Sequence, residues 1–364
     1  MPEMCQVTEC PGGDAHPRSA PIDESKLICL RPFYYCEISP EGDVRFCCSA
    51  WTKRAIGNVN DHTLAEIWNG EAAQSVRLEI LSGEWRAACN EICPVIIEHR
   101  RDADHPAHVR RYQHKEISPE LVDDVRLGKL RLDRPPTIFN LSNSPVCNLS
   151  CIMCSRDMRG YNPAMVKKVG EEIFGYLPTA REVVLTGHGD PLARPDSRKM
   201  LTDYHGENPN LRFNLITNAL LIPTYWERIK HQRFGWVTIS VDAATKETYE
   251  KIRVGGTWDQ LQSAIALMCR ERDHFLGGIT VNMTVMRSNF REIPAFIDWA
   301  HSLRFGVVFQ RVRGHCGDEN IFEAGDQESI SALREILSSA QGQARVDWGD
   351  LAEFMPVKSA GSLQ

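Results

Sequence analysis

The stretch Thr137-Ile-Phe-Asn-Leu-Ser-Asn-Ser-Pro-Val-Cys147-Asn-Leu-Ser-Cys151-Ile-Met-Cys154 joins a short apolar run to three closely spaced cysteines. The apolar run at residues 137–143 predicts a buried strand. Three thiolates with the spacing CxxxCxxC can occupy three corners of an iron–sulfur cubane from a single loop. The fourth iron then lacks a protein ligand and can bind a substrate or cofactor directly. The alternative is a zinc ion whose fourth ligand is a distant histidine.

Short apolar, β-branched runs alternate with helical stretches along the rest of the chain. We expect strands at residues 137–143, 182–186, 212–217, 236–241, 279–286 and 307–312, and helices at 165–176, 258–270 and 293–303. This alternation predicts βα units around a parallel sheet. The fold class is therefore α/β, a partial (β/α)6 TIM-like barrel or an open sheet, in which catalytic residues lie where strands end.

The composition excludes several classes of protein. The 364 residues are 42% hydrophobic, enough for a sizeable core, and the net charge of −6 argues against a protein that mainly binds nucleic acid. No apolar run approaches the length of a bilayer span, and the N-terminus lacks the pattern of a secretion signal. We expect a cytoplasmic protein with neither a nucleic-acid nor a membrane partner.

The 13 cysteines are distributed unevenly. Without an export signal they should stay reduced, so clustered cysteines indicate metal binding or catalysis. Six lie in the first hundred residues: Cys29, Cys36, Cys47, Cys48, Cys89 and Cys93. With a strand-turn-strand pattern at 33–47 and two short helices at 64–68 and 72–81, they predict a compact unit. That unit could bind zinc or a [4Fe–4S] cluster, and the spacing does not separate the two.

The chain divides into five predicted segments. These are a lead-in at 1–26, a small Cys-rich N-terminal domain at 27–95, a linker at 96–136, the barrel at 137–314 and a C-terminal capping segment at 315–364. The basic, histidine-rich stretch 98–111 is interpreted as a solvated part of the linker. The alternative is a patch that meets an anionic substrate or a partner protein.

The order of these motifs resembles the radical S-adenosylmethionine (radical SAM) superfamily, which places CxxxCxxC after the first strand of a partial (β/α)6 barrel. The resemblance implies that Cys147, Cys151 and Cys154 ligate a [4Fe–4S] cluster whose open iron binds S-adenosylmethionine. It also implies reductive cleavage to a 5′-deoxyadenosyl radical, which abstracts a hydrogen atom from the substrate. A flavodoxin or ferredoxin would supply the electron.

Three later segments resemble cofactor-binding elements of that family. Thr186-Gly-His-Gly-Asp-Pro-Leu192 is similar to the Gly-Gly-Glu-Pro stretch that receives the methionine ammonium, although it carries His188 and Asp190. Ile216-Thr-Asn-Ala-Leu resembles a Thr-Asn-Gly element, and residues 239–253 resemble a segment of members with auxiliary clusters. The implied cofactor contacts are Met153, Gly187, Gly189, Asp190, Asn218, Ser240 and Arg253. Arg253 suits the methionine carboxylate because a guanidinium donates two parallel hydrogen bonds, and an ion pair or helix cap is the alternative.

The N-terminal unit resembles the SPASM or Twitch auxiliary-cluster domain. The likeness rests on Pro40-Glu-Gly-Asp-Val-Arg-Phe-Cys-Cys, Leu64-Ala-Glu-Ile-Trp-Asn-Gly and Cys89-Asn-Glu-Ile-Cys93. In the family this domain usually follows the barrel, whereas here it precedes it. The resemblance implies one auxiliary [4Fe–4S] cluster on Cys89, Cys93 and two upstream cysteines. Cys36 and Cys47 are the expected pair, with Cys29 or Cys48 as substitutes and zinc or a purely structural role as the alternative.

The leading hypothesis is a radical SAM oxidoreductase or epimerase that acts on a small polar molecule such as a sugar or aminocyclitol. Cys316 follows the last expected strand, where a thiol could return a hydrogen atom to a substrate radical and cause epimerisation. The other interpretation of Cys316 is an exposed loop cysteine. The rival enzyme hypothesis is a maturase that modifies a ribosomally made peptide. The non-enzyme alternative is an iron–sulfur electron carrier or a zinc-stabilised binding protein.

Overall fold

A computed structural model of the chain describes residues 29–93, 96, 118–154, 161–185, 188–314, 316–323 and 325–355. The predicted lead-in, the basic stretch at 98–111 and the cofactor candidate Gly187 lie outside the described residues. Within the described part of the chain, no helix combines the length and the apolar character needed to span a bilayer.

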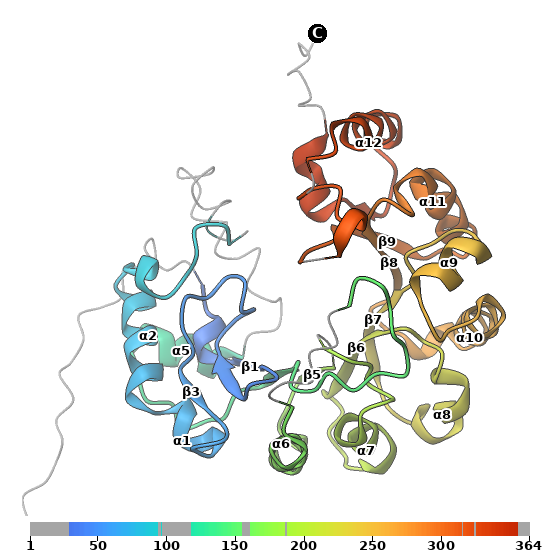
Figure 1. Cartoon of the computed structure of the whole chain (residues 1–364). Helices are drawn as coiled ribbons and strands as arrows, with labels where there is room; N and C mark the ends of the chain where they lie inside the picture. The colour runs from blue at the N-terminus through green and yellow to red at the C-terminus, as the bar shows by residue number, and fades with distance from the viewer. Residues whose placement is uncertain are drawn as a thin grey trace, which may run out of the picture.

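One ten-stranded sheet organises the molecule, in the order β10-β9-β8-β7-β6-β5-β4-β1-β2-β3. The strands are β1 (Tyr35–Ile38), β2 (Asp43–Arg45), β3 (Gly57–Asn58), β4 (Ile138–Leu141), β5 (Glu182–Leu185), β6 (Arg212–Thr217), β7 (Phe234–Ser240), β8 (Ile279–Val285), β9 (Gly306–Arg311) and β10 (Val346–Asp347). Neighbours from β1 and β4 to β10 pair in parallel, and β2 and β3 are antiparallel. The sheet curves into an arc that does not close (Figure 1), which confirms the partial barrel.

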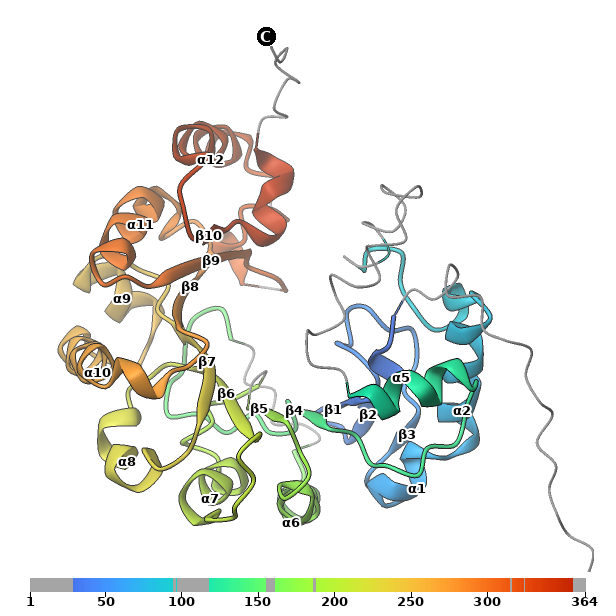
Figure 2. The same ribbon diagram turned by 180° about the vertical axis from the view of Figure 1, so that it is seen from behind.

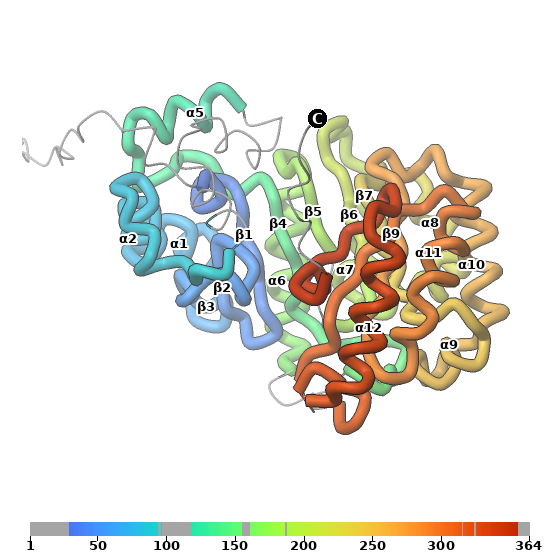
Figure 3. The backbone as a smooth tube through the Cα atoms, turned by 90° about the horizontal axis from the view of Figure 1, so that it is seen from above, coloured from blue at the N-terminus to red at the C-terminus, as the bar shows by residue number. Residues whose placement is uncertain are grey.

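Helices cover the outside of the arc (Figures 1 and 3). Around the barrel they are α6 (Pro163–Tyr176), α7 (Pro195–Asp203), α8 (Ile222–Ile229), α9 (Lys246–Ile252), α10 (Trp258–Arg270), α11 (Ile293–Ser302) and α12 (Gln327–Ala340), and beside the first strands α1 (Leu64–Trp68), α2 (Glu71–Leu81) and α5 (Pro119–Arg126). The described residues also contain short 3-10 helices: η1 (Arg31–Phe33), η2 (Trp85–Ala87), η3 (Arg272–His274), η4 (Phe290–Glu292), η5 (Gly317–Glu319) and η6 (Gly349–Phe354). Local sequence explains several starts: Thr63 and Thr257 form capping boxes with Glu66 and Gln260.

The two faces of the sheet differ in chemistry. Along β7, Val237 and Ile239 are fully buried against the helices, whereas Trp236, Thr238 and Ser240 on the opposite face stay partly exposed. Registered partners in a parallel sheet share a face, so the inner face can be followed from strand to strand. Its polar side chains include Tyr35, Glu37, Asn140, Glu182, Asn214, Thr238, Ser240, Asn282 and Gln310. The barrel interior therefore presents hydrogen-bonding groups.

The cysteine-rich N-terminal unit is joined to the barrel through the sheet. Strand β1 pairs in parallel with β4 over four residues, from Tyr35 opposite Ile138 to Ile38 opposite Leu141 (Figure 2). Without β1, the β4 edge would expose unpaired backbone groups. At the other end, β10 extends the sheet beyond β9, so the residues after Gly314 add a strand as well as helices.

A buried arginine ties the N-terminal unit together. Arg77 on α2 is completely buried, and its guanidinium donates to the carbonyl oxygens of Pro32 at 2.9 Å, Leu130 at 2.7 Å and Trp68 at 2.8 Å. The guanidinium carbon also lies 4.6 Å from the centroid of the Trp68 ring. One side chain thus satisfies three carbonyl groups from three separate segments.

We predict that Arg77→Met lowers the free energy of unfolding by at least about 2 kcal/mol, because three buried carbonyls lose their donors. Chemical denaturation of the variant and the parent measures the difference. The control is Arg86→Met, since the Arg86 side chain is 66% exposed and only covers the outer side of the Trp85 ring. We expect the control to change stability by less than about 0.5 kcal/mol. Equal losses in both variants would contradict the role given to Arg77.

Candidate functional site

The three-cysteine loop leaves the carboxyl end of β4 and lies against the segment that follows α9. Ser150 N donates to Val254 O at 2.8 Å, and Ile152 N donates to Ile252 O at 3.0 Å. Cys147 and Cys151 are half-buried and Cys154 is exposed. The backbone of the loop is therefore held in place while its thiols stay accessible to a ligand.

Arg194 fixes the base of this loop. Its guanidinium donates to Leu141 O at 2.9 Å and to Asn143 Oδ1, and it forms an ion pair with Asp196 at 2.7 Å. Both members of the pair have almost no exposed side chain. A buried pair of this kind is costly unless it is fully hydrogen-bonded, and here it orients the chain where β4 becomes the loop.

Gly189 and Asp190 join the loop after β5 to its neighbours. Gly189 has φ +80°, and a Cβ there would lie 2.3 Å from Val146 O, so only glycine fits. The Asp190 carboxylate accepts from Thr217 Oγ1 at 2.7 Å, Asn218 N at 2.9 Å and Leu192 N at 3.0 Å. Burial raises the pKa of Asp190, and these hydrogen bonds oppose the rise. The carboxylate is thus engaged by three donors of the protein itself.

Asn218 extends this connection to the cysteine loop. Its Nδ2 donates to Asn148 Oδ1 at 2.9 Å and lies 3.7 Å from Cys147 Sγ. The next residue, Ala219, has φ +66° and is fully buried. That left-handed conformation favours glycine, which explains why a Thr-Asn-Gly element is the expected form of this turn.

Arg253 reaches the second cysteine of the loop. Its Nη1 lies 3.6 Å from Cys151 Sγ, and its Nη2 pairs with Asp242 Oδ2 at 2.5 Å. Asp242 is fully buried and also accepts from Thr284 N at 2.7 Å. Burial raises the pKa of the Cys151 thiol, and the charge of Arg253 opposes the rise. The ion pair expected as an alternative is present, and it directs the guanidinium at the cysteine loop.

The other predicted residues lie around this loop. Ser240 ends β7 on the inner face, two residues before Asp242. Met153 packs against the buried cluster of Ile252, Met286 and Val312. Cys316 lies beside it, with Sγ 3.8 Å from Met153 O and 3.7 Å from Arg313 O. The structure therefore places the Cys316 thiol next to the cysteine loop.

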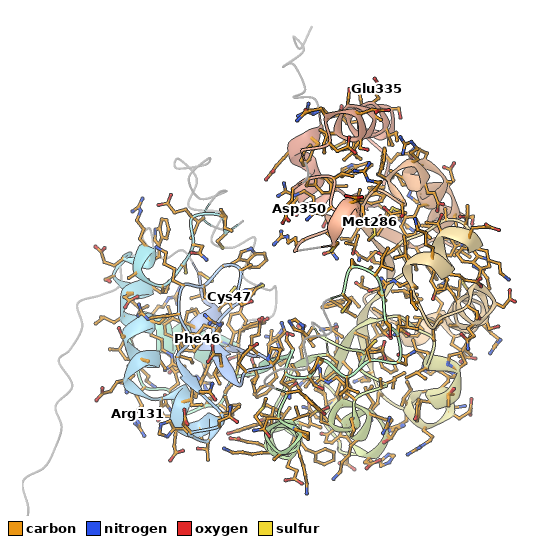
Figure 4. All side chains as sticks on the ribbon, viewed as in Figure 1. Phe46, Cys47, Arg131, Met286, Glu335 and Asp350 are labelled. Atoms are coloured by element: carbon orange, nitrogen blue, oxygen red, sulfur yellow. The ribbon has the colours of Figure 1, made fainter. Side chains whose placement is uncertain are left out.

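A second group of thiols lines a pocket in the N-terminal unit. Four cysteines surround it: Cys29, Cys47, Cys89 and Cys93. Its other walls are largely apolar and include Phe46 and Trp85. Burial raises the pKa of Cys47 and of Cys89 to about 12, with neighbouring thiols adding to the rise. Figure 4 shows Cys47 and Phe46 in this unit, across the open side of the arc from Asp350.

Cys36, expected from the sequence as a ligand together with Cys47, does not line this pocket. Side chains alternate along β1, so Cys36 points to the outer face while Tyr35 and Glu37 point inward. Cys36 has no exposed surface, and its pKa is raised by burial and by the nearby carboxylates Glu37 and Glu172. Cys29, the substitute expected from the sequence, lines the pocket.

The thiol of Cys48 is affected by charged side chains from both sides of the open barrel. Burial raises its pKa and Glu37 adds to the rise, while Arg31 and Arg313 oppose it. Arg313 follows β9, so the smallest of these effects comes from a residue on the opposite side of the open barrel. Cys48 does not line the four-cysteine pocket.

Two residues of these sites were missed in the sequence. Asp242 gives only the signal of an acidic residue two positions after Ser240, because its φ of +66° takes it out of the strand and strand alternation does not apply to it. Arg31, whose Nη1 lies 3.1 Å from Cys47 Sγ, gives a weaker signal, two residues after Cys29. Its partner is distant in sequence, so only the folded chain reveals the contact.

This arrangement defines a class of protein: an open parallel (β/α) barrel with a three-thiol loop after the first of its six consecutive strands and a cysteine-rich unit on the same edge. Residues 142–300 match the radical SAM superfamily, and residues 29–94 match SPASM, an iron–sulfur cluster-binding domain. The chain belongs to the radical SAM superfamily and carries a SPASM domain ahead of its barrel.

Named relatives share part of the chain. Over 186 residues it is 26% identical to a probable GTP 3′,8-cyclase of Methanococcus maripaludis, covering 50% of this chain and 59% of that protein. Over 192 residues it is 26% identical to an AdoMet-dependent heme synthase of Methanosarcina barkeri, covering 50% of this chain and 53% of that protein. The chain thus spans little more than half the length of these relatives.

Two solved structures are among those that resemble part of the chain. SuiB of Streptococcus suis has 16% identity and a TM-score of 0.44, covering 76% of this chain and 64% of that one. The protein anSMEcpe, solved with bound AdoMet and a Cp18Cys peptide, has 16% identity and a TM-score of 0.39. The match covers 56% of this chain and 60% of that one. These values are too low to indicate a substrate.

A radical SAM domain with a SPASM domain implies S-adenosylmethionine and [4Fe–4S] clusters as cofactors. The donor sets fit, because thiolates are the soft ligands that hold such clusters. Among the described residues, no three His, Cys, Asp or Glu side chains are arranged to hold a single metal ion. The ligands of a cubane bind four different iron atoms, so they can lie farther apart than the ligands of a single metal ion.

We predict that Asp190→Asn lowers the free energy of unfolding by about 1–3 kcal/mol, because an amide cannot accept from all the donors around it. Chemical denaturation without S-adenosylmethionine measures this loss. The control is Asp133→Asn, whose side chain is 89% exposed and should leave stability unchanged. The contrary result would be unaltered stability with S-adenosylmethionine binding at least about tenfold weaker, which is a loss of about 1.4 kcal/mol in binding free energy. That result would make Asp190 a direct ligand of the cofactor.

Proposed function

We propose that the chain is an enzyme that abstracts a hydrogen atom from a C–H bond of a small polar substrate and completes a two-electron oxidation. The observation that carries the proposal is the three-thiol loop at the carboxyl end of β4, with Arg253 3.6 Å from Cys151. When bound, the cluster and S-adenosylmethionine supply a 5′-deoxyadenosyl radical at this end of the barrel. The proposed cluster ligands there are Cys147, Cys151 and Cys154.

The remaining residues of the loop region position the cofactor in this proposal. Arg253, held by Asp242, offers a guanidinium to the methionine carboxylate. Gly189 leaves room for a backbone carbonyl to approach the ammonium, and Gly187 stays a prediction from the sequence. Asn218, Ser240 and Met153 complete the proposed contacts. Asp190 acts by holding two loops together, since its carboxylate already accepts three hydrogen bonds.

The side chains on the inner face of the sheet support the proposal that the substrate is polar. Hydrogen-bonding side chains reach this face from β1 and from β4 through β9, and include Glu37, Asn140 and Asn282. Covering such groups with an apolar ligand costs free energy, because they lose their hydrogen bonds to water and gain no new ones. A sugar or aminocyclitol offers hydroxyl and amino groups that match them. The proposed reductant is a flavodoxin or ferredoxin, and the proposed compartment is the cytoplasm, where thiols stay reduced.

The N-terminal domain, proposed to span residues 27–95, supplies the oxidant. We propose that Cys29, Cys47, Cys89 and Cys93 ligate one auxiliary [4Fe–4S] cluster, because these four line one pocket. Bound there, the cluster would accept the one electron that a substrate radical has to lose after hydrogen-atom abstraction, and one proton would leave to water or a basic group. The substrate thus loses two electrons and two protons in total.

A second candidate reaction is epimerisation, which the position of Cys316 favours. Its thiol lies beside the cysteine loop, with Sγ 3.8 Å from Met153 O. A thiol there could return a hydrogen atom to the opposite face of the substrate radical, and a reductant would then regenerate the thiol from its radical. This reaction keeps the substrate at its original oxidation level.

We predict that anaerobically reconstituted parent protein holds about eight irons, as expected for two [4Fe–4S] clusters. Iron and sulfide analysis should find about four after replacing Cys147, Cys151 and Cys154 together by alanine. Cys29→Ala should likewise lose the N-terminal cluster and keep about four irons. Cys36→Ala, the matched control, should keep all the iron. Loss of iron in Cys36→Ala but not in Cys29→Ala would restore the ligand set expected from the sequence. A parent without iron would refute the proposed function.

We predict that Cys316→Ala separates the two reactions. If the enzyme oxidises its substrate, the variant keeps forming product and 5′-deoxyadenosine, and product made in deuterated water carries no carbon-bound deuterium. If it epimerises, the parent product gains a carbon-bound deuteron from the exchangeable thiol, and the variant loses that incorporation. Mass spectrometry of the product distinguishes these results. Full epimerase activity in the variant would exclude Cys316 as the donor.

A further inference from the structure

Arg31 lies between the four-cysteine pocket and the barrel. Its backbone N–H donates to Cys29 Sγ at 3.4 Å, and its Nη1 donates to Cys47 Sγ at 3.1 Å. Two of the four pocket thiols therefore receive hydrogen bonds from one residue. The arginine belongs to η1, immediately before β1, so the start of that strand sets its position.

Two aromatic rings hold the guanidinium in place. Its carbon lies 4.8 Å from the centroid of the Tyr35 ring and 5.9 Å from that of Trp51. Within the described part of the chain, no carboxylate lies within ion-pair distance of Arg31. The positive charge is thus fixed beside the sulfurs without a described counter-ion.

The same residue is linked to the inner face of the barrel. Tyr35, beneath Arg31, donates from its hydroxyl to Glu37 Oε2 at 3.3 Å. Asn140 on β4 donates to the Tyr35 hydroxyl at 2.9 Å and to Glu37 Oε2 at 2.9 Å. Since β4 also leads into the three-cysteine loop, a continuous set of contacts runs from the thiol pocket to the substrate-facing surface.

We propose that Arg31 raises the reduction potential of the N-terminal cluster, and so makes it an acceptor for the electron that the substrate radical releases. Reduction adds one negative charge to the cluster, and a fixed positive charge stabilises that form more than the oxidised form. Hydrogen bonds to the ligating sulfurs act in the same direction. This inference rests on the proposed function, because it requires a cluster on Cys29 and Cys47.

The test is a redox titration followed by electron paramagnetic resonance. It uses the full chain with Cys147, Cys151 and Cys154 replaced by alanine, so that only the N-terminal cluster contributes a signal. In this background, Arg31→Gln removes the charge, and Arg54→Gln is the matched control. Arg54 lines the same pocket, but its charge is paired with the Glu79 carboxylate.

At a fixed potential we expect Arg31→Gln to lower the ratio of reduced to oxidised cluster at least about tenfold, which for one electron is about 59 mV. Arg54→Gln should leave the ratio unchanged. Arg31→Lys keeps the charge but loses the planar fork, so the ratio should fall about threefold. If Arg31→Gln holds no iron, Arg31→Met, which also removes the charge, is titrated in its place: a lowered ratio supports the inference and a parent ratio overturns it.

The two proposals fail in different ways. An Arg31→Gln variant with a full cluster and the parent potential would overturn the role of Arg31 and leave the proposed function intact. Equal shifts in Arg31→Gln and Arg54→Gln would also overturn it, because any change to the pocket wall would then suffice. No iron in the triple-alanine parent, despite reconstitution, would refute the auxiliary cluster itself.

Discussion

The parallel pairing of β1 with β4 is the constraint on which the rest of the molecule depends. Four consecutive residue pairs join a strand of the N-terminal unit to the strand that carries the three-cysteine loop. Backbone groups at a sheet edge need partners, so β1 satisfies the edge that an open barrel leaves exposed. Its register then determines that Tyr35 and Glu37 face inward and that Arg31 lies beside the thiol pocket. One set of backbone hydrogen bonds thereby sets the relation between the two proposed metal centres.

Buried charges occur where a loop must be held in one position. The Arg194–Asp196 pair fixes the base of the cysteine loop, and the Arg253–Asp242 pair directs a guanidinium toward Cys151. Each pair bears the desolvation cost of burying ions, which is acceptable only with further hydrogen bonds. Such pairs give geometry more than stability. That suits the proposed reaction, in which a reactive radical must meet one C–H bond.

Local patterns in the sequence predicted a large part of the fold. The six barrel strands and the hairpin around Pro40 to Asp43 follow from apolar runs and turn residues, because these depend on neighbours along the chain. The choice between Cys29 and Cys36 could not be made this way. Cys29 precedes β1 and Cys36 lies within it, so their positions in the sequence are similar. Only the hydrogen bond of Tyr35 with Asn140, 105 residues later in the chain, shows which face of β1 points inward.

The sequence by itself determined the class of chemistry, since three cysteines at CxxxCxxC spacing after a strand leave one iron of a cubane open wherever that loop folds. It also determined that a second cysteine-rich unit exists. The tertiary structure decided which four cysteines share a pocket, that Arg31 contacts two of them, and that Asp242 holds Arg253. These contacts join segments far apart in the chain, and their distances depend on sheet register and packing, which no local pattern records.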